Sequence, residues 1–499
     1  MTTPHGKLVR GLDSTTSSPL FQGRFGRMFR ELPAAQFGTT ETENIDNLTK
    51  LAVAMSADPD DPKDGPDDEE SGIPALYTYL GQFIDHDLTF DPDSSLQRQN
   101  DPSALTDYRN PAFDLDSVYG RGPSDQPYMY NAGNAFLLGE PIGGGSDAQA
   151  RDLPRNNAAI QRALIGDPRN DENVMVSQLQ GLFLRFHNRT LQDNPGKELH
   201  EIQQLVRFHY QYVVLNDFLP RVVHSDVLNE LKSGDKYDKA KLQFYKPKHE
   251  AFMPVEFSVA AYRLGHSMVR PGYRLNDAIL RPIFPTPRIS EGLTGFQKMN
   301  SAWAIDWGRF IDVEIRKYDG SAAEKAKRLQ FAYRLDTSLV NPLANLPPSV
   351  ASNPSSLPAR NLLRGWRLGL PSGQDVAQKM GVMALDDKEI LIGKAVDKPE
   401  QPLPNILSIS AVFTRNCPLW TYILAEAMHN REKVKIPVKE NLTISTPRLG
   451  PVGGRILAEV FLGLMFNDKH SMLNLAPNWH PTNNPQYALK HFVQYALGQ

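Results

Sequence analysis

Cysteine is almost missing from the chain, since Cys417 is its only one. A single cysteine cannot form a disulfide within the chain, which fits a protein from a reducing compartment or a bacterial cell. The N-terminal segment MTTPHGKLVRGLDSTTSSPL lacks the continuous apolar core that a secretory signal requires. We therefore expect a cytoplasmic protein by default, and export without such a signal stays open.

Two further absences exclude classes of partner. The chain has no basic excess, because 54 Lys and Arg stand against 57 Asp and Glu, so we do not expect it to bind nucleic acid. It also has no long hydrophobic run. The most apolar stretch, residues 456–466, contains Glu459 and is too short to cross a bilayer. We therefore expect no membrane span.

Segments with alternating β-branched residues are scarce, and apolar residues recur instead at helical spacing. This spacing predicts helices over residues 73–90, 174–191, 199–216, 253–269, 373–382, 411–429 and 452–466. Long irregular stretches lie between them, among them the proline-rich residues 339–360. The sequence therefore predicts a mainly α protein, with a single large helical domain, long irregular loops and little β structure.

The first 72 residues differ in composition from the rest of the chain. Residues 1–54 mix Gly, Ser, Thr and Arg, and we expect them to form an arm that lies on a larger body. Residues 56–72 carry a dense run of acids, which repel one another, so we expect an exposed loop there. We assign residues 1–72 to an N-terminal arm and acidic loop, and residues 73–499 to the main domain.

Polar side chains interrupt the apolar face of the helix predicted over residues 73–90. Gln82, Asp85 and His86 follow one another at i, i+3 and i+4, so they share one side of that helix. Each buried polar group costs roughly 1–3 kcal/mol unless it finds a partner. Asp87 lies about 100° further round the helix and can serve a different partner. A surface Asp-His-Asp cluster is the alternative, and the apolar surroundings make it less favourable.

Three further segments carry reactive residue types, although each is ordinary by itself. Arg169 and Glu172, in GDPRNDE, precede the helix predicted from residue 174, where acids commonly lie near a helix start. His266, in YRLGHS, follows Gly265, which would let a flat group approach closely. A lone histidine in such a helix is more often a hydrogen-bonded core residue than a ligand. Asn361 begins the basic stretch NLLR, which by itself indicates a solvated helix face.

Together and in this order, these segments resemble the animal-type haem peroxidases, the superfamily of the mammalian peroxidases and cyclooxygenases. GQFIDHD resembles the distal helix of that family, GDPRNDE the segment with the catalytic arginine, YRLGHS the proximal helix, and NLLR the helix that supports the proximal histidine. FDLDSVYG resembles its calcium loop and LFLRFHNR its core helix. The resemblance runs from residue 73 to about residue 370, and the glycine-rich residues 452–465 extend it.

The resemblance implies a haem-dependent peroxidase that reduces hydrogen peroxide and oxidises a small donor, such as a halide, thiocyanate or a phenol. The cofactor it implies is haem b. His86 would carry protons, Arg169 would stabilise charge on the departing oxygen, and Gln82 would hold a water or small anion. His266 would bind the iron through one ring nitrogen, and Asn361 would accept a hydrogen bond from the other.

The resemblance also assigns groups around the rest of the cofactor. Arg263 and Arg364 would pair with the haem propionates, with Arg367 as a further candidate. Asp85 and Glu172 match the two carboxylates that become ester-linked to haem methyls in mammalian relatives. We therefore expect that the haem can be attached covalently through one or both of these acids.

A calcium site is implied as well. Asp87, Asn110, the carbonyl of Ala112, Asp114 and Asp116 match the ligand positions of the family. Alternating oxygen donors with one distant carboxylate suit a hard cation such as Ca²⁺. Some relatives have hydroxyl residues at the positions of Asn110 and Asp116, so this chain departs from them in these two side chains.

Two alternative functions stay open. Fatty-acid dioxygenases of the same superfamily have a radical-forming tyrosine three residues before the proximal histidine, where this chain has Arg263, and Tyr262 lies four before. A non-catalytic haem-fold protein, used in adhesion or haem storage, could dispense with His86 or Arg169, and both are present. The sequence therefore favours a peroxidase over both alternatives.

Overall fold

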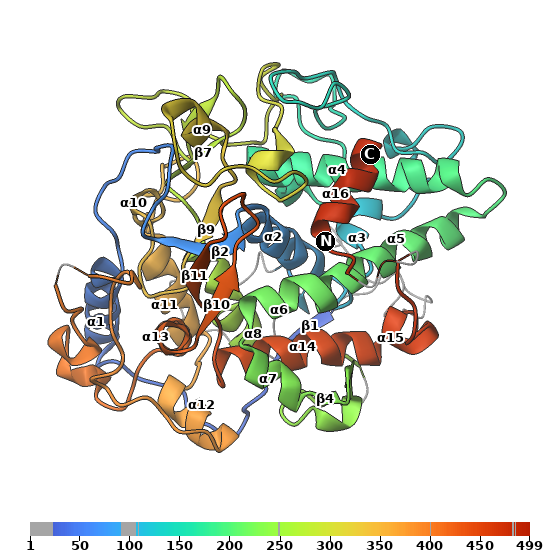
Figure 1. Cartoon of the computed structure of the whole chain (residues 1–499). Helices are drawn as coiled ribbons and strands as arrows, with labels where there is room; N and C mark the ends of the chain where they lie inside the picture. The colour runs from blue at the N-terminus through green and yellow to red at the C-terminus, as the bar shows by residue number, and fades with distance from the viewer. Residues whose placement is uncertain are drawn as a thin grey trace.

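Helices dominate the computed structural model, which describes residues 23–90, 106–107, 109–247, 250–399, 401–481, 484 and 486–499. Residues 1–22 of the predicted arm lie outside this range. The longest strands in the described part have five residues, and its largest sheet has three strands. The mainly α fold predicted from the sequence is confirmed. Figure 1 shows the helices gathered around α2 (Leu76–Leu88), which lies in the middle of the molecule.

The longer helices form the body of the protein: α1 (Glu41–Ala54), α4 (Val174–Asp193), α5 (Leu199–Val213), α11 (Leu357–Arg367), α12 (Gly373–Met380), α13 (Leu419–His429), α14 (Gly453–Asn467) and α16 (Leu489–Leu497). Short helices connect them: α3 (Asp116–Tyr119), α6 (Leu219–Val222), α7 (Ser225–Glu230), α8 (Val255–Ser258), α9 (Ala322–Lys327), α10 (Asn341–Ala344) and α15 (Met472–Leu475). Two 3₁₀ helices matter for the site, η3 (Pro168–Asp171) and η6 (Ala261–His266).

The strands form small separate sheets: β1 (Gly23–Gly26), β2 (Glu70–Pro74), β3 (Thr106–Asp107), β4 (Lys232–Ser233), β5 (Lys236–Tyr237), β6 (Met253–Pro254), β7 (Gly272–Arg274), β8 (Leu280–Pro282), β9 (Phe331–Tyr333), β10 (Arg431–Lys435) and β11 (Thr443–Pro447). β1 pairs antiparallel with β3 and parallel with β6, which joins the N-terminal segment to the main body. β2 pairs antiparallel with β9, and β10 with β11.

Helix α2 is surrounded by protein on nearly every side, and most of its residues are buried. Phe83 stacks on Phe183 of α4, with ring centroids 4.3 Å apart, and α4 in turn stacks Phe186 on Phe492 of α16 at 3.9 Å. Such aromatic pairs contribute about 0.5–1.5 kcal/mol each beyond the area that they bury. This packing holds α2 rigidly, so the polar side chains on its remaining face have fixed positions.

The structure corrects several predicted helix boundaries. The helix predicted over residues 253–269 is broken into α8 and η6, because Ala260 between them has a non-helical backbone with φ −127° and ψ −78°. The helix predicted over residues 411–429 begins only at Leu419, since Pro418 precedes it in an extended conformation. The helix predicted over residues 199–216 ends at Val213 and continues as a π-helical turn, Val214–Phe218.

The acidic run of residues 56–72 is not exposed throughout, which contradicts the loop expected there. Glu70 is 1% exposed and receives hydrogen bonds from Arg270, Arg328 and Tyr318. Its buried charge is therefore compensated by two arginines. Helix spacing and acid content could not reveal these partners, because they lie far along the chain.

The described part of the chain contains no helix that is both long and apolar enough to cross a membrane.

Candidate active site

The main cavity of the protein has a volume of about 1100 Å³. This slightly exceeds the volume of typical ligand cavities, roughly 300–1,000 Å³. Its wall brings together the side chains that the sequence singled out on separate segments: Gln82, Asp85, His86, Arg169, Glu172, Arg263, His266, Asn361 and Arg364. The cavity therefore joins α2, η3, η6 and α11 in one site.

His86 projects from the last turn of α2 and is 5% exposed. Its Nδ1 lies 2.8 Å from Oδ1 of Asn170 on η3, and no hydrogen bond of Nε2 is found among the described residues. Burial, with the nearby positive charge of Arg169, lowers the pKa of His86 to about 4. The imidazole is therefore neutral at physiological pH and has a ring nitrogen available in the cavity.

Arg169 is held beside His86 by a buried carboxylate. Its Nε and Nη2 donate to Oδ1 and Oδ2 of Asp167 at 3.1 and 2.7 Å, and Nη2 also donates to the carbonyl of His86 at 2.9 Å. Although burial opposes it, the charges of Arg169 and Arg109 hold the pKa of Asp167 well below its usual range. These hydrogen bonds fix Nε and Nη2, so the guanidinium group of Arg169 has a defined orientation in the cavity wall.

Gln82 and Glu172 meet on the same wall. Nε2 of Gln82 donates a short hydrogen bond to Oε1 of Glu172, and Oε1 of Gln82 accepts from Nδ2 of Asn173 at 3.0 Å. Burial raises the pKa of Glu172 to about 7. Asp85 also lines the cavity and accepts a hydrogen bond from Thr89 Oγ1 at 3.1 Å. Both acids therefore face the space that a cofactor would occupy.

His266, at the end of η6, lies close to Asn361 on α11. Nδ1 of the imidazole is 2.8 Å from Nδ2 of Asn361. An amide nitrogen can only donate, so Asn361 presents its donor side to the ring here, whereas the resemblance implied that Asn361 accepts this hydrogen bond. Acceptance requires the amide turned by about 180°. Burial, reinforced by Arg263, lowers the pKa of His266 to about 3. Apart from Gly265 itself, its two chain neighbours and the adjoining helix backbone, no described heavy atom lies within 4 Å of the place that a Cβ would take at Gly265. A neutral histidine here borders open space.

The arginines predicted near the cofactor do not all reach the cavity. Arg263 and Arg364 line it. Arg367 does not belong to its wall and instead forms an ion pair with Glu41 at the start of α1. The structure therefore does not bring Arg367 to the cavity, and it places this side chain, one turn after Arg364, against the start of α1.

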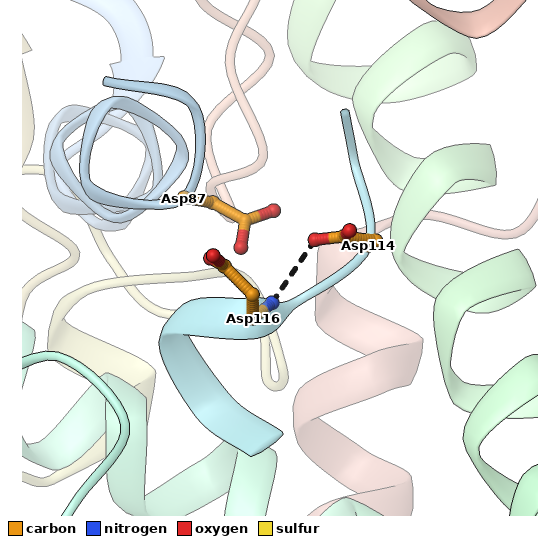
Figure 2. Close-up of side chains that lie close together, drawn as sticks. All are labelled: Asp87, Asp114 and Asp116. Carbon is orange, nitrogen blue, oxygen red and sulfur yellow. Dashed lines mark hydrogen bonds between the residues drawn. The ribbon is translucent and has the colours of Figure 1, made fainter. Parts of the chain in front are cut away.

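A second cluster of acids lies at the C-terminal end of α2, next to His86. Asp87, Asp114 and Asp116 each offer a carboxylate oxygen, and these oxygens all lie within 4.8 Å of one another. Figure 2 shows the three carboxylates converging: Asp87 comes from α2, Asp114 from the loop before α3, and Asp116 from the start of α3. Asn110 belongs to the same cluster, since its Nδ2 donates to Oδ2 of Asp114 at 2.5 Å. Ala112 is buried in the same loop.

The acidic cluster contains more negative charge than its neighbours compensate. Oδ1 of Asp116 is buried and has no hydrogen-bond partner among the described residues. Arg109 Nη1 donates to Oδ2 of Asp116 at 3.2 Å, and Arg109 Nε donates to Asp167 at 3.0 Å. Burial and mutual repulsion raise the pKa of Asp87 to about 7. Oxygen donors in this number and closeness fit a divalent cation.

The chain belongs to the animal haem peroxidase family, whose model matches residues 106–400, more than half of the chain. Human thyroid peroxidase is 27% identical over 233 residues, which cover 45% of this chain and 23% of that protein. The chorion peroxidase of Aedes aegypti is 28% identical over 137 residues, or 24% of this chain and 17% of that protein. The chain thus spans well under half the length of these curated relatives.

Solved structures agree with this fold. Peroxidase A from Dictyostelium discoideum is similar with a TM-score of 0.55 and 14% identity, covering 91% of this chain and 89% of that one. A fatty acid alpha-dioxygenase from Arabidopsis thaliana is similar with a TM-score of 0.52 and 12% identity, covering 93% and 74%. At these identities the likeness concerns the fold, which peroxidases and dioxygenases share.

The cavity fits the haem that the family implies. It combines a large volume, a neutral histidine beside the open space at Gly265, and two arginines suited to carboxylates. The sequence identified these residues but missed those that hold them. Asn170, Asp167 and Arg109 are buried polar groups whose partners lie on other segments. The available indication was that Asp167 and Asn170 lie within GDPRNDE and that Arg109 lies just before FDLDSVYG.

Proposed function

We propose that the protein is a haem-dependent peroxidase, which reduces hydrogen peroxide and oxidises a small anionic or phenolic donor. The observation that supports this proposal most strongly is that His86, Arg169 and the His266–Asn361 pair line one cavity. A non-catalytic haem-binding protein would not need a neutral base and a fixed guanidinium at the same cavity. Both are kept here, and both are anchored by buried partners.

The residues on η6 and α11 would hold the haem, and the residues on α2 and η3 would act on hydrogen peroxide. His266 would bind the iron through Nε2, and the amide of Asn361, turned so that its oxygen faces the ring, would accept a hydrogen bond from Nδ1. A bound haem would supply the redox chemistry that the side chains lack. Neutral His86 takes a proton from one oxygen of hydrogen peroxide and gives it to the other, which leaves as water. Arg169 stabilises the negative charge on the departing oxygen, and Gln82 orients a water or small anion.

A side-by-side assay tests this function against its nearest rival. The haem-loaded protein is given hydrogen peroxide with bromide, thiocyanate or a phenol, and separately a fatty acid with oxygen but no peroxide. A peroxidase oxidises at least one donor and consumes peroxide in proportion. Oxygen uptake with the fatty acid, and no oxidation of any donor, would identify a dioxygenase instead.

The dioxygenase alternative has one supporting observation, the structural similarity to fatty acid alpha-dioxygenase. The position that carries the radical-forming tyrosine in such enzymes is Arg263 here, and it lines the cavity. Tyr262 also lines the cavity, but its hydroxyl donates to the carbonyl of Gly81 at 3.0 Å. The cavity therefore has no tyrosine at the required position, which favours a peroxidase.

We further propose that the acidic cluster binds calcium through Asp87, Asp114 and Asp116, with Asn110 and the carbonyl of Ala112 as further ligands. Ligand binding stabilises a protein by about 2.7 kcal/mol when the ligand is at 100 times its Kd. Removal of calcium with a chelator is therefore expected to lower Tm by several degrees, measured by scanning calorimetry. The Asp114→Asn variant should lose most of this calcium dependence.

Exposed Asp58, in the acidic run, provides the matched control for that substitution. Asp58→Asn removes the same charge and should keep the calcium-dependent Tm. Equal Tm values for the wild-type protein with calcium and with chelator would contradict the calcium site.

We also propose that haem can be attached covalently through Asp85, Glu172 or both. Each ester would form when a carboxylate oxygen replaces one hydrogen of a porphyrin methyl, while one hydrogen peroxide is reduced to two waters. Arg169 does not neutralise these acids by ion pairing, since its partner is Asp167. Two carboxylates buried beside a porphyrin edge are costly unless paired or reacted.

Acid–acetone extraction measures this attachment. After treatment with small amounts of hydrogen peroxide, a fraction of the haem is expected to stay with the wild-type polypeptide. The Asp85→Asn/Glu172→Gln double variant should release all of its haem, as should wild-type protein that has received no peroxide. Complete release from peroxide-treated wild-type protein would show that these acids are only structural.

A further inference from the structure

His86 is connected to a chain of two buried amides that no part of the proposed reaction uses directly. Nδ1 of His86 lies 2.8 Å from Oδ1 of Asn170, and Nδ2 of Asn170 donates to Oε1 of Gln180 on α4 at 2.9 Å. Asn170 and Gln180 are both 0% exposed. Neither amide belongs to the cavity wall, so the hydrogen-bond partners of both amides must come from the protein itself.

We propose that Asn170 is a positioning residue that fixes the tautomer of His86, with Gln180 fixing the orientation of Asn170 in turn. An amide can present either its oxygen or its nitrogen to a histidine, and only the oxygen accepts a hydrogen bond from the N–H group at Nδ1. With Oδ1 toward the ring, the hydrogen of neutral His86 resides on Nδ1, and Nε2 keeps its lone pair. The inference rests on the proposed function, because that lone pair is what receives the proton of hydrogen peroxide.

The chemistry of Gln180 explains how the orientation is held. Asn170 can present its oxygen to His86 only if something else accepts a hydrogen bond from its Nδ2, and Gln180 Oε1 is that acceptor. The Nε2 group of Gln180 has no partner among the described residues. A buried donor without a partner costs roughly 1–3 kcal/mol. The arrangement therefore keeps an imperfectly satisfied amide in place, which fits a functional constraint better than simple packing.

The tautomer itself is the first measurement. The full chain is loaded with diamagnetic zinc protoporphyrin, and nitrogen-15 NMR determines which ring nitrogen of His86 carries hydrogen, with the His86→Ala variant used to assign the resonances. We expect the hydrogen on Nδ1 and an unprotonated Nε2. A hydrogen on Nε2 at neutral pH would overturn the proposal, because Asn170 would then be presenting its nitrogen.

Two substitutions of Gln180 test the direction of the amide chain. Gln180→Glu retains an acceptor for Asn170 and removes the donor that lacks a partner, so its rate of reaction with hydrogen peroxide should stay near that of the wild type. Gln180→Leu removes the acceptor, and its rate should fall severalfold. A higher rate for Gln180→Leu than for Gln180→Glu would show that Gln180 does not act as the hydrogen-bond acceptor of Asn170.

Substitutions of Asn170 separate positioning from packing. Asn170→Val removes the acceptor at similar volume, and its rate should fall about tenfold or more, a part of the roughly 10²–10⁴-fold that acid–base catalysis contributes. Asn170→Asp keeps an acceptor and adds a negative charge next to the ring. An opposite charge at such a distance raises the pKa of a histidine by about 1–3 units. As the pH is lowered, the rate of the Asn170→Asp variant should therefore begin to fall at a higher pH than the rate of the wild type.

That comparison depends on the charges around the ring staying the same. Arg169, Asp167 and Asp85 are the charged groups that act on His86, and none is altered in the Asn170 variants. The control is Asn188→Val on α4, which removes a half-buried amide that bonds to the backbone of Phe136. It should lose stability without any change in rate or pH profile.

Failure of this inference can be told apart from failure of the proposed function. Rapid reaction of the wild-type protein with hydrogen peroxide, together with Asn170 variants that behave like Asn188→Val, would refute the positioning role alone. A chain that binds no porphyrin, or that never reacts with peroxide, would refute the peroxidase proposal instead.

Discussion

Replacing His86 with alanine is expected to slow the reaction of the haem-loaded protein with hydrogen peroxide by about 10²–10⁴-fold, while haem stays bound. The reason is that His86 is the neutral base at the cavity and that its partner Asn170 cannot exchange protons in its place. Stopped-flow absorption after mixing with peroxide measures the rate. Haem should remain, because the residues assigned to hold it, His266 and Asn361, are on other elements.

His187 provides a matched control for this substitution. It is buried on α4, burial lowers its pKa to about 4 as for His86, and it lies outside the cavity wall. His187→Ala should cost stability through its lost bond to Tyr119 but leave the peroxide rate unchanged. An unchanged rate in His86→Ala would mean that His86 does not carry the proton.

The pH dependence of the same rate follows from the lowered pKa of His86. A base must be neutral to accept a proton, and burial keeps His86 neutral down to a pH of about 4. The rate should therefore be level from about pH 5 upwards on this account, and it should fall as pH drops through 4. A midpoint near 6.5, the value of an unperturbed histidine, would indicate that the base is exposed or is another residue.

Replacing His266 with alanine is expected to have the second large effect, loss of most of the bound haem and of the peroxide reaction with it. His266 is the neutral histidine next to the open space at Gly265, and among the described residues His86 is the only other histidine that lines the cavity. Haem content per chain, from the pyridine haemochrome spectrum, measures the effect. Added imidazole should restore part of the reaction, because it can replace the missing ligand.

Asn361→Leu should produce a weaker version of the same defect. Removing the partner of a metal-bound histidine typically costs about 10–100-fold in metal affinity or activity. His187→Ala again controls for the loss of a buried ring. Full haem content and an unchanged spectrum in His266→Ala would show that the iron is held by another residue.

The sequence predicted the fold class because helical spacing is a local property that each segment carries by itself. Boundaries were less accurate where a single residue interrupts the pattern. Ala260 breaks the helix predicted over residues 253–269 although nothing in its side chain opposes a helix. The reason is tertiary, since η6 must bring His266 to Asn361 while Tyr262 reaches the carbonyl of Gly81 on α2.

The candidate site was predictable where the resemblance supplied roles, and those roles stay predictions until they are measured. The structure adds that the residues concerned share one cavity. What the sequence could not supply are contacts between distant segments. Gln180 lies in α4, whose sequence has the apolar spacing of an ordinary buried helix. Its hydrogen bond to Asn170 follows only from the way in which α4 packs on η3. Arg367 shows the reverse case, a residue of the expected type that packs against α1 instead.

The most direct test of the central claim is a titration of the haem-loaded wild-type protein with hydrogen peroxide, followed by its absorption spectrum. We expect a histidine-ligated haem whose spectrum changes rapidly with one equivalent of peroxide and returns when two equivalents of a one-electron donor, such as a phenol, are added. A chain that binds no haem, or a bound haem whose spectrum peroxide leaves unchanged, would contradict it.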